Sequence, residues 1–167
     1  MSNTIEDFRN FFMPNGEKEV FEVNKYVESA YKIIRATLVY HHIEVEIIKP
    51  KESISIYGYP SEFSQVILNL LDNAKDILLK REIESPKIVI EAKVENSYLV
   101  VSVRDNAGGI DEDISKDIFN IYFTTKGKDG TGLGLYISKL IIENKFMGDI
   151  YSVNGEKGAE FFIKIKL

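Results

Sequence analysis

The chain has 167 residues, of which 44% are hydrophobic, and its formal net charge is −5. This length suffices for one domain with a sizeable core and is short for two. The absence of cysteine excludes disulfides, thiolate nucleophiles and cysteine-type zinc sites, and two adjacent histidines are too few for a histidine-rich metal site. The negative charge argues against nucleic acid or an anionic membrane as the main partner.

No stretch of the sequence approaches the ~20 apolar residues that a membrane-spanning helix needs, and the N-terminus lacks a signal-peptide pattern. We therefore expect a soluble, cytoplasmic domain. Residues 2–13 place apolar side chains near helical spacing, and Pro14-Asn15-Gly16 ends this segment. Two interpretations stay open for it: the tail of an element that begins upstream, and an ordinary N-terminal core helix.

Apolar periodicity and turn residues predict the remaining secondary structure. Asn24 is expected to cap the first helix of this part, and Gly58-Tyr59-Pro60 to turn the chain into its longest helix. In chain order, the expected elements are an extended segment at 20–23, a helix at 25–40, strands at 43–47 and 54–56, a helix at 61–81, strands at 87–95 and 98–104, a short helix near 114–119, a helix ending at 144, and strands at 149–153 and 160–166.

The longest helix carries a polar stripe along the edge of its apolar arc, made of Gln65, Asn69, Asn73, Asp76 and Lys80. Asparagine at two consecutive turns is costly for helix formation and adds no packing. Carboxamide oxygens are hard ligands that suit Mg²⁺ beside phosphates, so the stripe indicates a ligand site. The alternative is a solvated face that carries asparagine by chance.

The strand at 98–104 follows a hairpin turn at Glu95-Asn96-Ser97 and runs directly into Asp105-Asn106-Ala107-Gly108-Gly109-Ile110. An acidic side chain at a strand end can accept a hydrogen bond from an exocyclic amine, and the paired glycines let backbone pass close to a ring. A simple turn is the alternative interpretation.

Four glycines, Gly127, Gly130, Gly132 and Gly134, precede the helix that ends at 144. A glycine-rich loop that leads into a helix places free backbone N–H groups and the positive end of the helix dipole together. This arrangement is typical of a phosphate-binding site, and an ordinary loop followed by a helix is the alternative.

Five segments together resemble the catalytic ATP-binding domain of sensor histidine kinases, in the superfamily of gyrase B, the Hsp90 chaperones and MutL. The resemblance extends from about residue 20 to residue 167, with the motifs in the family's order. The matching segments are 65–74 (the N box), 105–110 (the first glycine box), 118–126 (the F box), 130–135 (the second glycine box) and 158–163 (the closing strand).

The resemblance implies an α+β fold of the Bergerat type. This fold is a two-layer α/β sandwich with a mixed, mainly antiparallel sheet, helices packed on one face, and a mobile ATP lid at 120–132. It further implies that residues 17–167 are the catalytic domain. Thr4–Phe12 resembles the end of the helical hairpin that precedes such domains, so residues 1–16 are expected to be the end of a dimerisation and phosphoacceptor helix plus a linker.

The family also implies cofactors, ATP and Mg²⁺, and residues to hold them. Asn73 would be the principal Mg²⁺ ligand, with Asn69 one turn earlier at the same cation or its water, and these are the two predicted catalytic residues. Asp105 would accept from the adenine amine, with Gly109 allowing close approach. The other nucleotide contacts implied are Asp76, Ala107, Ile110, Phe123, Thr124, Thr125, Lys126, Gly130, Thr131, Gly132, Leu133, Gly134 and Leu135.

Two positions depart from the family pattern in ways that affect the chemistry. Asp76 stands where many members carry a basic residue on the phosphates, so positive charge is expected from Lys80, Lys126 or Lys128. In the ATP-hydrolysing relatives a glutamate stands at the position of Asn69 and activates water. An amide cannot act as that base, so the sequence indicates phosphoryl transfer rather than hydrolysis.

The function implied is that of a protein histidine kinase that transfers the γ-phosphate of ATP to a histidine on a helical-hairpin domain of the same parent protein. We expect this catalytic fragment not to autophosphorylate when it is alone. A response regulator is expected as an indirect partner. The domain is expected to be cytoplasmic whether or not the parent protein has a membrane anchor. The alternatives are a nucleotide-gated binding module and a serine kinase of the anti-sigma type on the same fold.

Overall fold

The computed structural model describes residues 17–123 and 132–167. Apart from the short helix α4, the elements agree with those predicted to within one or two residues, and the segment at 2–13 lies outside the described residues. In chain order the elements are β1 (Glu19–Glu22), α2 (Val23–Tyr40), β2 (Glu44–Ile48), β3 (Ser55–Gly58), α3 (Pro60–Lys80), β4 (Lys87–Glu95), β5 (Tyr98–Asp105), α4 (Glu112–Ser115), α5 (Gly134–Lys145), β6 (Asp149–Asn154) and β7 (Ala159–Lys166).

A five-stranded sheet forms one layer, with the strands in the order β2-β4-β5-β7-β6. β2 pairs with β4 in parallel, and the pairs β4–β5, β5–β7 and β6–β7 are antiparallel. β1 and β3 form a separate antiparallel pair. The prediction of an α+β fold with a mixed, mainly antiparallel sheet is confirmed.

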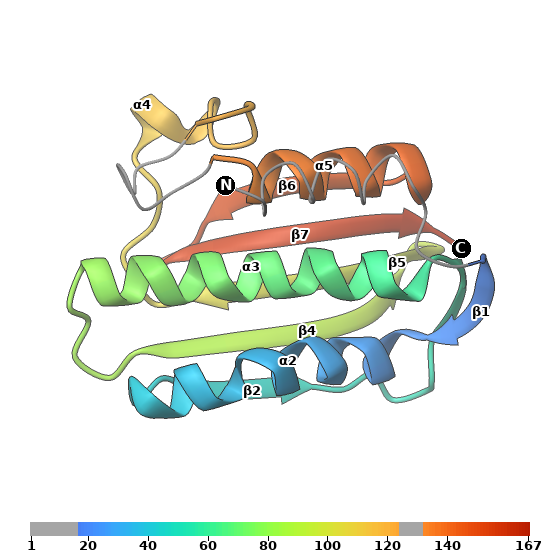
Figure 1. Cartoon of the computed structure of the whole chain (residues 1–167), viewed down its shortest axis with the longest axis horizontal. Helices are drawn as coiled ribbons and strands as arrows, with labels where there is room; N and C mark the ends of the chain where they lie inside the picture. The colour runs from blue at the N-terminus through green and yellow to red at the C-terminus, as the bar shows by residue number, and fades with distance from the viewer. Residues whose placement is uncertain (1–16, 124–131) are drawn as a thin grey trace.

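Helices α2, α3 and α5 lie across one face of this sheet (Figure 1). The alternation of side chains along the strands determines which face they cover. In β7, Phe161, Ile163 and Ile165 are buried while the residues between them are half-buried. Val101 and Val103 of β5 lie opposite Ile163 and Phe161 and are buried as well. The predicted two-layer sandwich with helices on one face is therefore confirmed.

Helix α3 lies in the middle of the helical layer, between α2 and α5 (Figure 1). Pro60 occupies its first turn, where the fixed φ of proline suits a helix start. Glu62 in the first turn and Lys80 in the last have the signs that the helix dipole favours. Its apolar arc is fully packed, with Phe63 and Leu71 both 0% exposed. This packing fixes where the polar edge of the helix lies.

Helix α2 begins earlier than the predicted asparagine cap, and that prediction is wrong. The helix starts at Val23, its N-cap is Glu22, and no side chain caps it. Val23 is 0% exposed and its amide donates to Ile54 O at 2.9 Å. Burial of Val23 and this contact with the β3 segment set the start of the helix, which places Asn24 inside the first turn.

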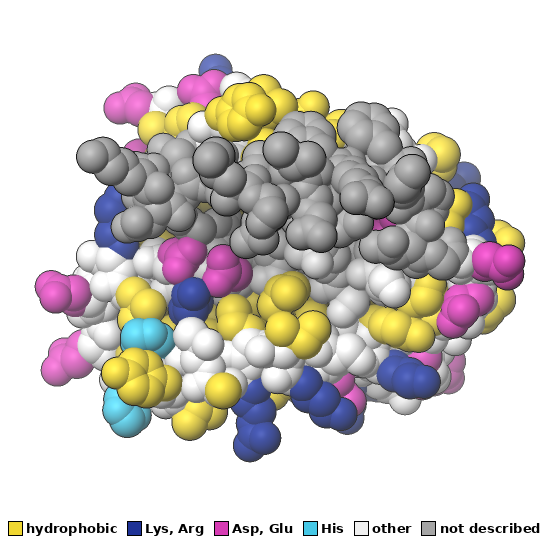
Figure 2. All heavy atoms as spheres, viewed as in Figure 1, with side chains coloured by type: hydrophobic (Ala, Val, Ile, Leu, Met, Phe, Trp, Pro, Cys, Tyr) yellow, Lys and Arg dark blue, Asp and Glu magenta, His cyan; other side chains and the backbone are white. Residues whose placement is uncertain are grey.

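The two ends of the molecule are formed by different elements. The C-terminal end of α3, the end of β5, α4 and the start of α5 lie together, on the left in Figure 1, whereas β1 lies at the opposite end. In Figure 2, several basic side chains lie along the lower edge of this face and acidic ones lie mainly toward its two sides, with the two histidines at the end of α2. No helix among the described residues is long and apolar enough to cross a membrane.

Candidate functional site

Most of the predicted site residues are described. Five of them, Thr124, Thr125, Lys126, Gly130 and Thr131, lie outside the described residues, as do most of the expected lid and Lys128. Phe123 lies in the segment after α4, half-buried, with its amide donating to Asn120 O at 3.1 Å. The others fall at one end of the molecule, on the turn after β5, on helix α3 and at the start of α5.

Asp105 closes β5 with a carboxyl group that is buried, the residue being only 5% exposed. Its Oδ1 accepts hydrogen bonds from the amides of Ala107 at 2.9 Å and Ala159 at 3.4 Å. Burial raises the pKa of Asp105 above its ordinary value, while those two amides and the charge of Arg81 partly offset the effect. No described residue donates to Oδ2, which leaves this oxygen for a ligand.

The turn after Asp105 depends on glycine at three positions. Gly108 and Gly109 have φ of +96° and +92°, a region that residues with a side chain rarely adopt. Gly158, at the start of β7, packs directly on Asp105, since an added Cβ would lie 2.0 Å from Asp105 O and 2.7 Å from its Oδ1. The backbone of β7 therefore supports the carboxylate as well as the turn.

Two side chains that sequence reasoning did not select hold this turn from outside. Arg81, just after α3, donates from Nη1 to Ala107 O at 2.7 Å and to Gly109 O at 2.6 Å. Asn154, at the end of β6, accepts from Ile110 N at 2.8 Å and donates to Ile110 O at 2.7 Å. A single arginine or asparagine at the end of an element belongs to no motif, so no pattern in one sequence would have found either.

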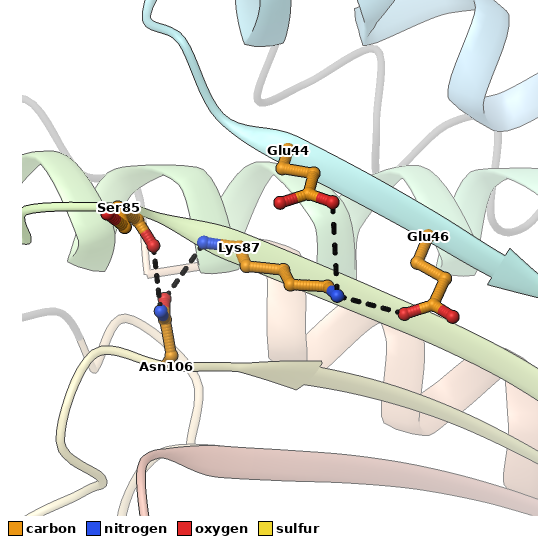
Figure 3. A network of polar contacts seen from close by, with 5 residues as sticks. All are labelled: Glu44, Glu46, Ser85, Lys87 and Asn106. Atoms are coloured by element: carbon orange, nitrogen blue, oxygen red, sulfur yellow. Dashed lines mark hydrogen bonds and ion pairs between the residues drawn. The ribbon is translucent and has the colours of Figure 1, made fainter.

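Asn106 fastens the same turn to the start of β4 (Figure 3). Its Oδ1 accepts from Lys87 N and its Nδ2 donates to Ser85 O, both at 2.9 Å. The ammonium group of Lys87 in turn lies 3.0 Å from Glu46 and 3.9 Å from Glu44 of β2. The turn that follows β5 is thus tied to residues of, or directly beside, α3, β4, β6 and β7.

The polar stripe of α3 faces α5. Asn69 Nδ2 donates to Gly134 O at 3.3 Å and to Ser138 Oγ at 3.1 Å, while its Oδ1 accepts from Gln65 at 3.0 Å. Ser138 is 0% exposed and itself donates to Gly134 O at 2.8 Å. Asn69 thus connects α3 to the first turn of α5, a role that the sequence did not predict.

Asn73 differs from Asn69, although both occupy one face of α3, a single turn apart. The residue is half-buried, and its amide forms no hydrogen bond within the described parts of the chain. Residues 17–123 and 132–167 contain no group of three or more histidine, cysteine or acidic residues that could hold a metal ion. A cation at this end would therefore depend on amide oxygens such as that of Asn73 together with oxygens from a ligand.

Asp76 does not present an isolated negative charge. Lys75 lies 2.8 Å from Asp72 and 3.3 Å from Asp76, and its side chain is only 17% exposed. Burial alone would lower the pKa of Lys75, but hydrogen bonds and attraction to the two aspartates outweigh it and raise the pKa above its ordinary value. The side chain of Lys75 therefore reaches Asp76 of the polar stripe.

The first turn of α5 combines close backbone packing with open space. Gly132 has φ +69°, and an added Cβ would lie 2.2 Å from the backbone of Tyr122, so only glycine fits there. Leu133 is buried, whereas an added Cβ on Gly134 would meet no atom of the described residues within 4 Å. No acidic residue lies in the first turn of α5. The positive end of its dipole is therefore not opposed by a carboxylate of its own first turn, which suits an anion.

Comparisons with known proteins agree on one family. Residues 58–167 match the family described as histidine kinase-, DNA gyrase B- and HSP90-like ATPases. The two-component sensor PprA of Pseudomonas aeruginosa is 35% identical over 144 residues, which cover 84% of this chain and 16% of PprA. The signal transduction histidine-protein kinase AtoS of Escherichia coli is 31% identical over 152 residues, which cover 90% of this chain and 24% of AtoS. The chain thus spans a quarter or less of these relatives.

Solved structures share the fold over nearly the whole chain. The nucleotide-free catalytic domain of histidine kinase ThkA superposes with a TM-score of 0.78 at 28% identity, covering 90% of this chain and 96% of that one. Full-length ShkA in complex with AMPPNP superposes with a TM-score of 0.80 over 98% of this chain and 34% of ShkA, at 21% identity, a likeness of fold alone.

Proposed function

The chain belongs to the family of histidine kinase-, DNA gyrase B- and HSP90-like ATPases, and on that premise we propose that it binds ATP with Mg²⁺ and transfers the γ-phosphate to a histidine on a helical-hairpin domain of its parent protein. The observation that carries the proposal is the buried Asp105 carboxylate, which is fixed through Oδ1 and has no donor for Oδ2 among the described residues. A buried charge of this kind is costly unless a ligand meets it.

Asp105 is the proposed reader of the base. Its Oδ2 would accept a hydrogen bond from the exocyclic amine of adenine, an interaction that guanine, with a carbonyl at that position, does not offer. Gly109 has φ +92°, and an added Cβ there would lie 3.0 Å from Asn154 Oδ1, so this part of the turn favours a residue without a side chain. These features support recognition of adenine.

Asn73 is the proposed ligand of Mg²⁺, through its carboxamide oxygen. Bound Mg²⁺ would neutralise the charge of the phosphates during transfer, which is the chemistry that the metal supplies in phosphoryl transfer. Asn69 Oδ1 accepts one hydrogen bond, from Gln65, so its second lone pair could bind the cation or a water on the cation. Both residues fit an oxygen-ligated cation held jointly with a triphosphate.

The first turn of α5 is the proposed cradle for the phosphates. Gly134 leaves room for a ligand to approach its backbone, and the helix dipole favours negative charge there. Lys80, Lys126 and Lys128 remain the proposed sources of positive charge. In this proposal the chain binds the nucleotide, aligns the γ-phosphate and neutralises its charge. Because residue 69 is an asparagine, its amide cannot act as a base that activates water.

The acceptor and its context are also proposals. Residues 1–16 would be the end of the hairpin helix and a linker, residues 17–167 the catalytic domain, and a response regulator an indirect partner. The relatives that the chain matches are sensor kinases by name, which favours transfer over the alternatives of a nucleotide-gated module or a serine kinase.

Transfer in trans tests the proposal. The parent's hairpin domain, supplied separately with γ-labelled ATP and Mg²⁺, should acquire an acid-labile, base-stable label, while the chain alone acquires none. Asn73→Ala should lower the rate of labelling about a hundredfold or more, because a group that positions charge at the transferring phosphoryl is lost. Asn144→Ala, on an exposed position near the end of α5, is the matched control and should not change it.

Each outcome separates the candidates. Nucleotide binding without a label on the hairpin would favour a gated binding module, and an acid-stable label would favour a serine kinase. An unchanged rate in Asn73→Ala would remove Asn73 from the site.

A further inference from the structure

Arg81 holds a position that no motif explains. It is the C-cap residue of α3, and its single nitrogen Nη1 donates to two carbonyl oxygens of the turn after Asp105, those of Ala107 and Gly109. Both distances, 2.7 and 2.6 Å, lie below the ~2.9 Å of an ordinary N–H···O bond. Charge-assisted hydrogen bonds are shortened in this way and are about twice as strong as neutral ones.

The two carbonyl groups flank Gly108, and this part of the turn needs a restraint. Gly108 and Gly109 both have positive φ. Two glycines in succession give the unfolded and unliganded backbone more freedom than any other pair. Two carbonyl oxygens that converge on one point repel each other unless a cation lies between them, and Arg81 is that cation.

The restraint also joins two parts of the proposed site. Arg81 stands two turns beyond Asn73 on the same helix axis, and its guanidinium ends on the turn that begins with Asp105. On the other side of the turn, Asn154 binds both backbone groups of Ile110. The turn is therefore held between α3 and β6, with Arg81 donating from the α3 side to the carbonyl oxygens of Ala107 and Gly109.

We propose that Arg81 is a specificity-determining positioning residue: it locks the Gly108-Gly109 turn to α3 so that Asp105 meets the amine of adenine in register with Asn73. Arg81 acts through the backbone of the turn and does not itself touch the nucleotide. The inference rests on the proposed function, in that it presumes adenine beside Asp105.

The test compares base discrimination in Arg81→Gln, Arg81→Lys and Arg104→Gln, with Asp105→Asn as the reference for the site. Arg104 precedes Asp105 and is paired with Glu160 at 3.6 Å, so Arg104→Gln removes the same charge from the adjacent residue without touching the turn. The measurement is the calorimetric affinity of the folded chain for AMPPNP and for GMPPNP with Mg²⁺, alongside a thermal melt of each variant.

Arg81→Gln should weaken AMPPNP binding about tenfold or more, since two charge-assisted bonds that hold the turn are lost. GMPPNP, whose base carries a carbonyl in place of the 6-amino group of adenine, should change much less, so the preference for adenine falls. Arg81→Lys keeps the charge on a shorter side chain and should fall between the parent and Arg81→Gln, and it replaces Arg81→Gln in the comparison should that variant fail to fold. Arg104→Gln should match the parent.

Two results would overturn the role of Arg81: equal losses of affinity for both nucleotides in Arg81→Gln, or no loss for either. Either result counts against Arg81 alone when Asp105→Asn abolishes AMPPNP binding, as the proposed function requires. If Asp105→Asn bound AMPPNP as the parent does, the proposed function itself would fail, and the two failures are thereby distinguished.

Discussion

The carboxyl group of Asp105 is buried, and burial disfavours its charged form. The pKa of Asp105 lies above its ordinary value of 3.8 because of burial, in spite of the hydrogen bonds from Ala107 and Ala159 and the nearby Arg81. The folded chain therefore holds this proton more tightly than the unfolded chain does. As pH rises from the ordinary pKa through the raised one, ionisation of Asp105 costs stability, and the cost is complete above the raised pKa. Such tension between burial and charge is common at functional sites.

The pH dependence of stability checks this account. Asp105→Asn keeps an oxygen that can accept from the amides of Ala107 and Ala159 and removes the ionisation. Its free energy of unfolding, relative to the parent, should therefore increase as pH rises from about 4 to about 7. Urea denaturation at a series of pH values measures the difference. A difference that shrank toward neutral pH would mean that the folded state favours the charged form.

A pair of glycine substitutions separates packing from ligand space. Gly158→Ala places a Cβ against the backbone of Asp105 and should cost about 1–3 kcal/mol or more of stability. The added Cβ of Gly134→Ala meets no atom of the described residues within 4 Å, so it should leave the free chain as stable or more so, yet weaken binding of AMPPNP with Mg²⁺. Thermal melts with and without the nucleotide distinguish the two. Normal nucleotide affinity in Gly134→Ala would place the phosphates elsewhere.

Some residues of the candidate site could be predicted from the sequence and others could not. Asn73 stood out because an amide within a helix interior is an unusual choice. Aspartate and glycine are ordinary turn residues, so the role of Asp105 came from the resemblance to a family. Arg81 and Asn154 gave no such signal, since their partners lie 28 and 44 residues away in the chain. Only the folded backbone brings them to the turn.

At the scale of elements, α3 is connected to α5 by the hydrogen bonds that the side-chain amide of Asn69 donates. Asn69→Asp tests whether Asn69 works mainly as this donor or as a metal ligand, because aspartate is a good ligand but cannot donate to Gly134 O or Ser138 Oγ. We expect the variant to lose about 1–3 kcal/mol of stability without nucleotide. Urea titration of the free chain measures it. Unchanged stability with tighter Mg²⁺-nucleotide binding would instead favour the ligand role.

A second connection between the same helices lies at their other ends. Lys145 in the last turn of α5 donates to Glu62 Oε1 in the first turn of α3, with both side chains largely buried. Glu62 Oε2 has no hydrogen-bond partner among residues 17–123 and 132–167. Removal of one partner leaves a buried charge, so Lys145→Met should cost about 3–5 kcal/mol. The double variant with Glu62→Leu should recover most of this loss in the same urea titration. A double variant that was less stable than Lys145→Met would show that the pair is not the cause.

The elements themselves were largely predictable, and their contacts were not. Period-2 alternation defined β4, β5 and β7 closely, and Asn96 and Ser97, both at positive φ, form the hairpin turn that their sequence indicated. The start of α2 was misplaced because burial of Val23 overrides the capping preference of Asn24. The short helix α4 begins earlier than predicted, since its apolar residues are too few to define a face.

At the scale of the whole molecule, the sheet places separate pieces of sequence at one end. The antiparallel pairing of β5 with β7, and of β7 with β6, brings the end of β5, the start of β7 and the end of β6 together. Helix α3 runs over them and supplies Asn73 and Arg81 at the same end. The fold class followed from the resemblance to a family, because the order of strands in a mixed sheet cannot be read from alternation alone. β1 and β3 occupy the opposite end, where they provide an internal reference for the test below.

The central claim is that the Mg²⁺-triphosphate lies between Asn73 and the first turn of α5. Nuclear magnetic resonance with Mn²⁺ in place of Mg²⁺ measures this directly, because the paramagnetic ion broadens signals only near itself. On addition of Mn²⁺ with AMPPNP, the side-chain amide signal of Asn73 and the backbone amide signal of Gly134 should disappear, while those of Val20 in β1 and Tyr57 in β3 stay sharp. Broadening at β1 and β3 with a sharp Asn73 signal would contradict the account.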